Sequence, residues 1–223
     1  MRKKQLALSL PTRGRPRKKG DVHKTKDGKI AHIERPKMDR NTPVHINIKV
    51  HKNIPNLRQK TFYRFFRQAV IKARIQGVRV IHFAIVKNHL HLLVEAQDNQ
   101  SLSRGVRSLL ISYAMRINRH LGRKGGIFTD RFNMEVIKFP KRMRYLLAYI
   151  FKNSAKHQKI AFTVDGYSSM PIFKEDKRLF GRKIATKWSR SVGTRLQKTL
   201  QEFLSPPKSW LAQSGWKQQT AIW

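Results

Sequence analysis

The stretch that decides the fold is Asn88-His89-Leu90-His91-Leu92-Leu93-Val94-Glu95. Successive side chains of a β-strand point to opposite faces, so the apolar residues at the even positions share one face, whereas His89 and His91 share the other. A tight Lys87-Asn88 connection joins this predicted strand to residues 78–86, which are expected to form the other strand of a hairpin. Both imidazoles therefore lie on one side of the predicted sheet.

The sequence on either side of the hairpin predicts the rest of the sheet. Alternating apolar residues predict a strand over residues 44–50, and apolar residues spaced by three and four predict helices over 57–76, 100–121 and 141–157. A short strand over residues 132–137 precedes the last helix. This order is that of a split βαβ sheet. We therefore predict an α+β fold, a ferredoxin-like or RRM-like antiparallel sheet with an additional C-terminal helix, in which two helices cover one face and leave the other free.

Composition restricts the class of partner. The chain has 223 residues, and its 49 Lys and Arg against 12 Asp and Glu give a formal net charge of +37, which predicts a polyanionic partner. No run approaches the roughly 18 apolar residues of a membrane-spanning helix, and the apolar start is too short for a signal peptide, so a cytoplasmic protein is expected. Because the chain has no cysteine, thiolate nucleophiles and cysteine zinc sites are excluded.

The two ends of the chain are basic and lack the periodicity of the middle. Residues 1–40 are predicted to be a disordered basic arm, residues 41–157 the catalytic domain, and residues 158–223 a basic extension with four tryptophans. Within the arm, Arg15 and Arg17 belong to a Gly-Arg-Pro cluster that resembles a minor-groove AT-hook, although sequence-independent phosphate binding is the favoured interpretation. The tryptophans either stack on bases or, as we favour, are buried in an add-on that docks on the core.

The polar face of the sheet is a candidate site. By strand parity His45, Asn47 and His82 can line the same surface as the histidine pair. A lone His-x-His is more often the polar side of a half-exposed strand than a metal site. The site hypothesis therefore needs support from another element.

The helix over residues 141–157 gives that support. Tyr149 and Asn153 lie one turn apart on the flank of its apolar stripe. A metal held by two imidazoles and an amide oxygen leaves positions open for phosphate oxygens, and a nearby phenol can attack phosphorus. Tyr149 can also be an amphipathic residue at the edge of the core, and Tyr145 competes for the nucleophile role but lies further toward solvent.

These residues together resemble the single-tyrosine HUH transposases of small bacterial insertion sequences and their REP-associated relatives. The resemblance runs from about residue 36 to 157. It rests on Pro43-Val44-His45-Ile46-Asn47-Ile48, Asn88-His89-Leu90-His91-Leu92, Arg107-Ser108-Leu109, Gly126-Ile127-Phe128-Thr129-Asp130-Arg131-Phe132 and Tyr149-Ile150-Phe151-Lys152-Asn153. A further likeness to longer transposase-like proteins lies in residues 164–169 and 209–216.

The resemblance implies a metal-dependent transposase and endonuclease that cuts and rejoins single-stranded DNA through a 5′-phosphotyrosine. It implies Tyr149 as the nucleophile, His89, His91 and Asn153 as ligands, and Mg²⁺ or Mn²⁺ as the ion. The expected partners are single-stranded or hairpin DNA and no membrane, with a homodimer as a possible assembly, in the cytoplasm and nucleoid of a bacterium. The candidate DNA contacts are His45, Arg15, Arg17, Arg107, Arg131 and Lys152.

Two other classes remain open from the sequence. A non-catalytic RNA- or DNA-binding module would use the same sheet, but RRM-type sheets bind single strands with aromatic residues, and this face carries histidines. A host-retained relative that nicks or binds DNA without transposing, or a replication or conjugation initiator of the wider HUH group, would share the same residues.

Overall fold

The structure is a computed structural model that describes residues 35–158, 165–173 and 190–217. Contacts divide the chain into residues 1–33 and 34–223, and all described residues belong to the second unit. The predictions made for the basic arm, including Arg15 and Arg17, lie outside the described residues.

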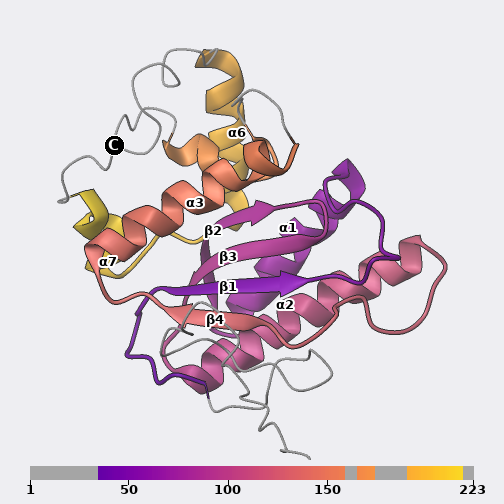
Figure 1. Cartoon of the computed structure of the whole chain (residues 1–223), viewed down its shortest axis with the longest axis horizontal. Coiled ribbons are helices and arrows are strands. Elements are labelled where there is room, and N and C mark those ends of the chain that lie inside the picture. Colours follow the sequence, from indigo (N-terminus) through magenta and orange to yellow (C-terminus); the bar gives the residue numbers. More distant parts are fainter. Residues whose placement is uncertain (1–34, 159–164, 174–189, 218–223) are drawn as a thin grey trace, which may run out of the picture. The chain divides into compact units, whose positions relative to one another are not determined.

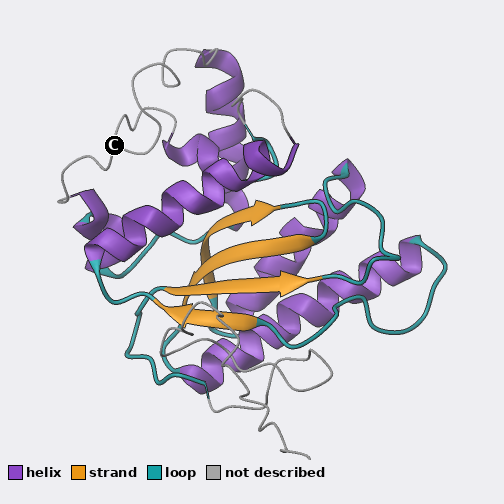
Figure 2. Cartoon of the chain, in the orientation of Figure 1, coloured by secondary structure: helices purple, strands orange, loops and turns teal. Residues whose placement is uncertain are grey.

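Four antiparallel strands form one sheet in the order β2-β3-β1-β4 (Figures 1 and 2). The α+β prediction is confirmed, and the predicted elements occur in the predicted order. The elements of this sheet domain are β1 (Val44–Lys49), α1 (Lys60–Ile75), β2 (Arg79–Ile85), β3 (His89–Glu95), α2 (Asn99–His120), β4 (Asn133–Val136) and α3 (Pro140–Gln158). They are followed by η1 (Met170–Phe173), α6 (Arg190–Phe203), α7 (Trp210–Gln213) and η2 (Gly215–Lys217).

Helices α1 and α2 bury their apolar stripes against one face of the sheet. The ring of Phe66 from α1 lies 4.9 Å from that of Phe83 in β2 and 6.0 Å from that of Tyr113 in α2. Helix α2 closely approaches the residue before β2 at Gly105, where an added Cβ would lie 2.3 Å from a methyl carbon of Val78. This core fixes which residues of each strand face inward, and hence which face outward.

The other face of the sheet is not free, and the prediction that it would be is wrong. Helix α3, with α7 and η2, covers part of it around Ile81, Ala84 and Leu93 (Figure 1). A bulge in β2 adds to the apolar surface of this face, because the register shift between Val80 and His82 places an additional side chain on it. The apolar residues at these outward positions need a partner, and the amphipathic α3 supplies it.

The described C-terminal segments pack against this domain. Leu200 and Phe203 of α6 join the first core, and Trp216, which is 1% exposed, joins the second. Burial of Trp216 agrees with the favoured interpretation of the tryptophans, whereas Trp210 is half exposed. The carboxylate of Glu95 is fully buried and accepts hydrogen bonds from the backbone N–H groups of residues 208 and 209.

Residues 165–173 close the β2 edge of the sheet. The N–H of Ile85 donates to the carbonyl of Tyr167 at 2.8 Å, and the N–H of Ser169 donates to the carbonyl of Phe83 at 2.9 Å. Arg58 holds the segment through two hydrogen bonds to the Asp165 carboxylate, at 2.7 and 3.1 Å. None of the described helices is long and apolar enough to cross a membrane.

Candidate active site

Three imidazoles form a continuous row on the outer face of β1 and β3. The Nε2 atoms of His89 and His91 lie 3.0 Å apart, and Nδ1 of His91 lies 3.1 Å from Nε2 of His45. Strand alternation places the pair on one face, as predicted, and the β1–β3 register then brings His45 beside His91. All three side chains are largely buried, so their ring nitrogens are directed mainly to one another rather than to water.

Polar groups hold both ends of this histidine row. The Oδ1 atom of Asn88 lies 2.9 Å from Nδ1 of His89. An amide oxygen can only accept, so this contact assigns the proton to Nδ1 and leaves a lone pair on Nε2 of the neutral ring. At the other end, Nδ1 of His45 lies 4.0 Å from a Glu135 oxygen, and Arg142 donates two hydrogen bonds to the same carboxylate, both 2.5 Å long.

His45 is neutral at ordinary pH. Burial lowers the pKa of His45 to about 4, with Glu135 opposing the shift and Arg142 adding to it. A neutral imidazole carries a lone pair and is the form that accepts a hydrogen bond or binds a metal.

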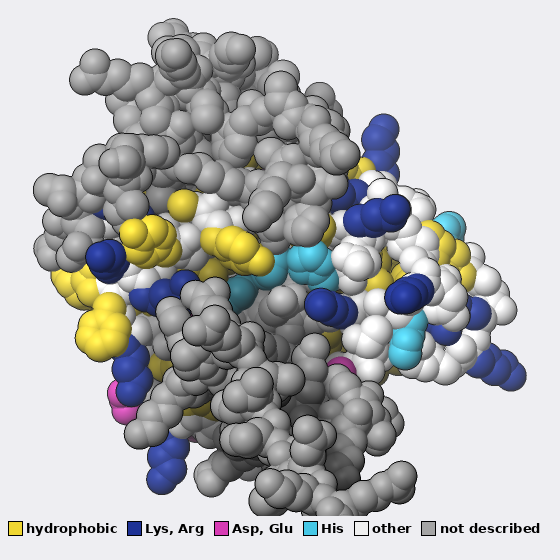
Figure 3. Space-filling model, in the orientation of Figure 1, with side chains coloured by type: hydrophobic (Ala, Val, Ile, Leu, Met, Phe, Trp, Pro, Cys, Tyr) yellow, Lys and Arg dark blue, Asp and Glu magenta, His cyan; other side chains and the backbone are white. Residues whose placement is uncertain are grey.

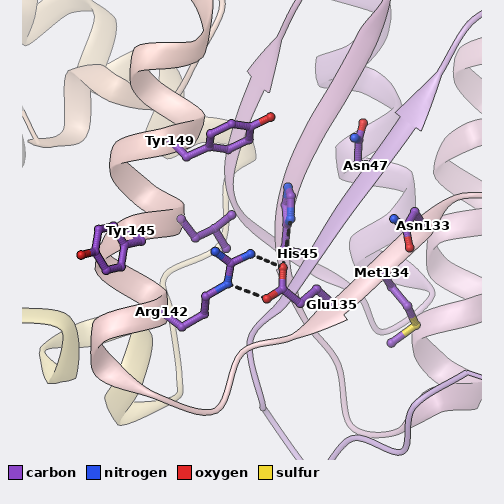
Figure 4. A pocket seen from close by; sticks show the side chains of 9 residues that line it. His45, Asn47, Asn133, Met134, Glu135, Arg142, Tyr145 and Tyr149 are labelled. Carbon is purple, nitrogen blue, oxygen red and sulfur yellow. Dashed lines mark hydrogen bonds and ion pairs between the residues drawn. The ribbon is translucent and has the colours of Figure 1, made fainter. Parts of the chain in front are cut away.

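Tyr149 lies next to the histidine row. Its ring packs edge-on against that of His91 with 5.4 Å between the centroids, and 52% of the residue is exposed. In Figure 4, Tyr149 extends from α3 toward β1, the strand that carries His45 and Asn47, whereas Tyr145 points the other way. The geometry thus separates two tyrosines that are one turn apart and favours Tyr149, which can face the site and solvent together.

Basic side chains lie around histidines on the face of the molecule drawn in Figure 3. Figure 3 shows histidine side chains beside hydrophobic side chains, with Lys and Arg around them. An anionic strand on this face would therefore meet basic groups and histidines together.

Residues 44–153 match the model of the family described as "Transposase IS200 like". The chain belongs to this family. The match includes both histidines of β3 and Tyr149, so the residues that carry the predicted site lie within the family's domain. Membership confirms the resemblance to single-tyrosine HUH transposases and establishes a DNA-processing role.

Solved structures were also compared. A REP-associated tyrosine transposase bound to a REP hairpin is 19% identical, with a TM-score of 0.49 over 59% of this chain and 76% of that one. A candidate transposase from Deinococcus radiodurans R1 is 15% identical, with a TM-score of 0.37 over 56% of this chain and 97% of that one. A bacterial tRNA(His) guanylyltransferase-like protein in complex with GTP is 10% identical, with a TM-score of 0.43 over 56% of this chain and 68% of that one. A comparison with curated proteins found no match.

The histidine pair of this IS200-like domain fits a divalent cation. Two adjacent ligand atoms about 2.1 Å from an octahedral ion lie about 3 Å apart, close to the 3.0 Å between the Nε2 atoms of His89 and His91. The described residues contain no group of three or more His, Cys, Asp and Glu that could hold a metal. The predicted third ligand, Asn153, lies in α3 one turn after Tyr149, but its side chain is outside the described residues.

The other predicted DNA contacts are spread over the domain. Arg107 is exposed on α2, on the opposite side of the sheet from the histidines, and Arg131 is partly buried just before β4. Lys152 lies in α3, but its side chain is outside the described residues. His45 belongs to the histidine row.

The sequence analysis missed Glu135. Its signal is visible only after β4 is placed beside β1, because that register sets Glu135 opposite His45. Arg142, which the sequence places among many basic residues, is likewise distinguished only by its ion pair with Glu135.

Proposed function

We propose that this chain is a metal-dependent transposase and endonuclease that cleaves and rejoins single-stranded DNA. In this proposal His89 and His91 bind Mg²⁺ or Mn²⁺, Asn153 completes the protein ligands, and Tyr149 is the nucleophile. The observation that carries it is the edge-on contact of Tyr149 with His91, whose Nε2 in turn faces that of His89. A phosphate held at the histidine pair would lie within reach of the phenol.

The chemistry is a transesterification. The Tyr149 oxygen loses its proton and bonds to the scissile phosphorus, while the bond from phosphorus to the 3′ oxygen breaks and that oxygen takes up a proton. The 5′ phosphate then stays on Tyr149, and the other product has a free 3′-OH. One phosphodiester replaces another, so a 3′-OH can reverse the reaction and rejoin strands without an external energy source.

The protein must make a weak nucleophile effective. A phenol is almost fully protonated near neutral pH, so stabilising the charge that develops on phosphorus is essential. A bound divalent cation would neutralise phosphate charge at this position. Tyr149 contributes orientation, because its ring is held against His91.

His45 and Glu135 are proposed to position the ligand His91. When Nε2 of His91 is used as a ligand, its proton resides on Nδ1 and is donated to Nε2 of His45. Nδ1 of His45 then carries the proton that faces Glu135. Such outer contacts fix the tautomer and the ring orientation of metal-binding histidines.

Affinity for the strand is proposed to come mainly from the net charge of +37. If about eight phosphates are neutralised on a single strand, log K falls with log salt at a slope of roughly −6. His89→Ala should therefore lose cleavage and keep much of its DNA affinity.

The test is formation of a covalent adduct. Labelled single-stranded hairpin DNA from the flanks of the protein's own gene is incubated with protein and Mn²⁺ or EDTA, and denaturing gels are run. A metal-dependent adduct is expected from the native protein and from Tyr63→Phe, a control on the opposite face of the sheet, but not from Tyr149→Phe. Tight binding without an adduct would favour a DNA-binding derivative instead.

A further inference from the structure

A pocket of about 440 Å³ lies beside Tyr149, between α3 and the adjacent strands β1 and β4 (Figure 4). It extends from the histidine row toward the β4 edge of the sheet. The side chains that line it are those of His45, Asn47, Asn133, Met134, Glu135, Arg142, Tyr145, Leu146 and Tyr149.

The charge of this pocket differs from that of the protein. Its fixed charges, among the described residues that line it, are those of Arg142 and Glu135, which neutralise each other through two hydrogen bonds of 2.5 Å. The chain as a whole carries +37. The pocket therefore offers a phosphate no net fixed positive charge and suits an uncharged group.

The lining is apolar and aromatic on one side. On α3, Tyr149 is 52% exposed with its ring directed toward the strands, and Leu146 adds an apolar contact, whereas the ring of Tyr145 points away from them (Figure 4). Exposed aromatic rings beside a strand-binding site are typical stacking partners of unpaired bases.

Two amides lie on the strand side. Asn47 and Asn133 occupy paired positions in the β1–β4 register and both line the pocket. The Oδ1 atom of Asn47 is buried and has no hydrogen-bond partner among the described residues. A buried polar atom in this state favours a ligand that supplies the missing partner. Since an amide offers both an acceptor and donors, it can pair with the edge of a base.

We propose that this pocket binds one unpaired nucleobase of the DNA strand, next to the phosphate that Tyr149 attacks. The side formed by the Tyr149 ring and Leu146 contacts the face of the base, and Asn47 and Asn133 read its polar edge. The assignment rests on the proposed function in that Tyr149 and the pocket engage the same strand. It makes Asn47 and Asn133 determinants of sequence preference close to the cleavage position.

The experiment measures binding without chemistry. Full-length Tyr149→Phe protein in EDTA is titrated, by fluorescence anisotropy, with oligonucleotides of only dA, only dC or only dT and with an abasic strand of the same length. Adding Asn47→Ala or Asn133→Ala should weaken binding of the preferred base-containing strand about tenfold, within the range for loss of a pairing between a side chain and a base edge, and leave binding of the abasic strand unchanged. Each amide variant should therefore also reduce the differences in affinity among the three bases.

Phe139→Ala is the matched control, because Phe139 is 68% exposed just before α3 and does not line the pocket. The proposal is overturned if the amide variants weaken binding of the abasic strand as much as binding of the others, if they weaken binding of none, or if Phe139→Ala has the same effect. It is also overturned if both amide variants keep the original ranking of bases. Asn133 is exposed, so Asn133→Ala should fold and still tests the proposal if Asn47→Ala does not fold. Failure of adduct formation would refute the catalytic proposal and leave these affinities measurable.

Discussion

Replacing His45 by alanine should weaken metal binding without removing a ligand. The hydrogen bond of 3.1 Å between Nε2 of His45 and Nδ1 of His91 would be lost, and His91 is only 1% exposed, so water has little access to the nitrogen left behind. An unsatisfied buried polar group costs about 1–3 kcal/mol. Loss of an outer contact to a metal-binding histidine typically lowers metal affinity about 10–100-fold. We therefore expect the Kd for Mn²⁺ to rise by that factor, measured by titration with electron paramagnetic resonance detection of free Mn²⁺.

Two further variants make this result specific. His120→Ala removes an exposed histidine of α2, on the other side of the sheet, and should leave the Kd unchanged. His45→Gln retains an amide that can accept from Nδ1 of His91 and should recover part of the affinity. An unchanged Kd in a folded His45→Ala protein would refute the positioning role, as would an equal loss in His120→Ala.

Three other predictions concern stability. Burial lowers the pKa of His82 to about 3, so protonation of this side chain opposes folding. The stability that neutral His82 contributes is complete above about pH 6.5 and is lost as the pH falls from there toward 3. When the pH is lowered from 7 to 5, the free energy of unfolding measured in urea should fall by about 2 kcal/mol more for the unmutated protein than for His82→Leu. Equal decreases in the two proteins would argue against this role of His82. Glu95→Ala should lower the free energy of unfolding by about 3 kcal/mol, since it removes the fully buried carboxylate that pairs with Arg79 and accepts from the backbone N–H groups of residues 208 and 209. The same change should raise hydrogen exchange in residues 206–217, and unchanged exchange would contradict the docking role of Glu95. Phe66→Ala should lower the free energy of unfolding by about 3–5 kcal/mol, and a loss under 1 kcal/mol would show that the site repacks.

The elements of the sheet domain could be predicted because their signals are local. Alternation identifies β1 and β3, and apolar residues at helical spacing identify α1, α2 and α3. The cover on the second face could not be found in this way. Leu93 and Ala84 occupy positions that parity assigns to the polar face, and only the approach of α3 explains why they are apolar.

The sequence by itself determined that His89 and His91 share one face, because the side chains of a strand alternate with a period of two, and it placed Tyr149 on the helix that follows. The tertiary structure decided what surrounds them. The register of β1 with β3 and β4 sets His45 between His91 and Glu135, and packing of α3 across the sheet brings Tyr149 to His91. Pairing between strands distant in sequence is fixed by burial of the common core, a property of all the elements together.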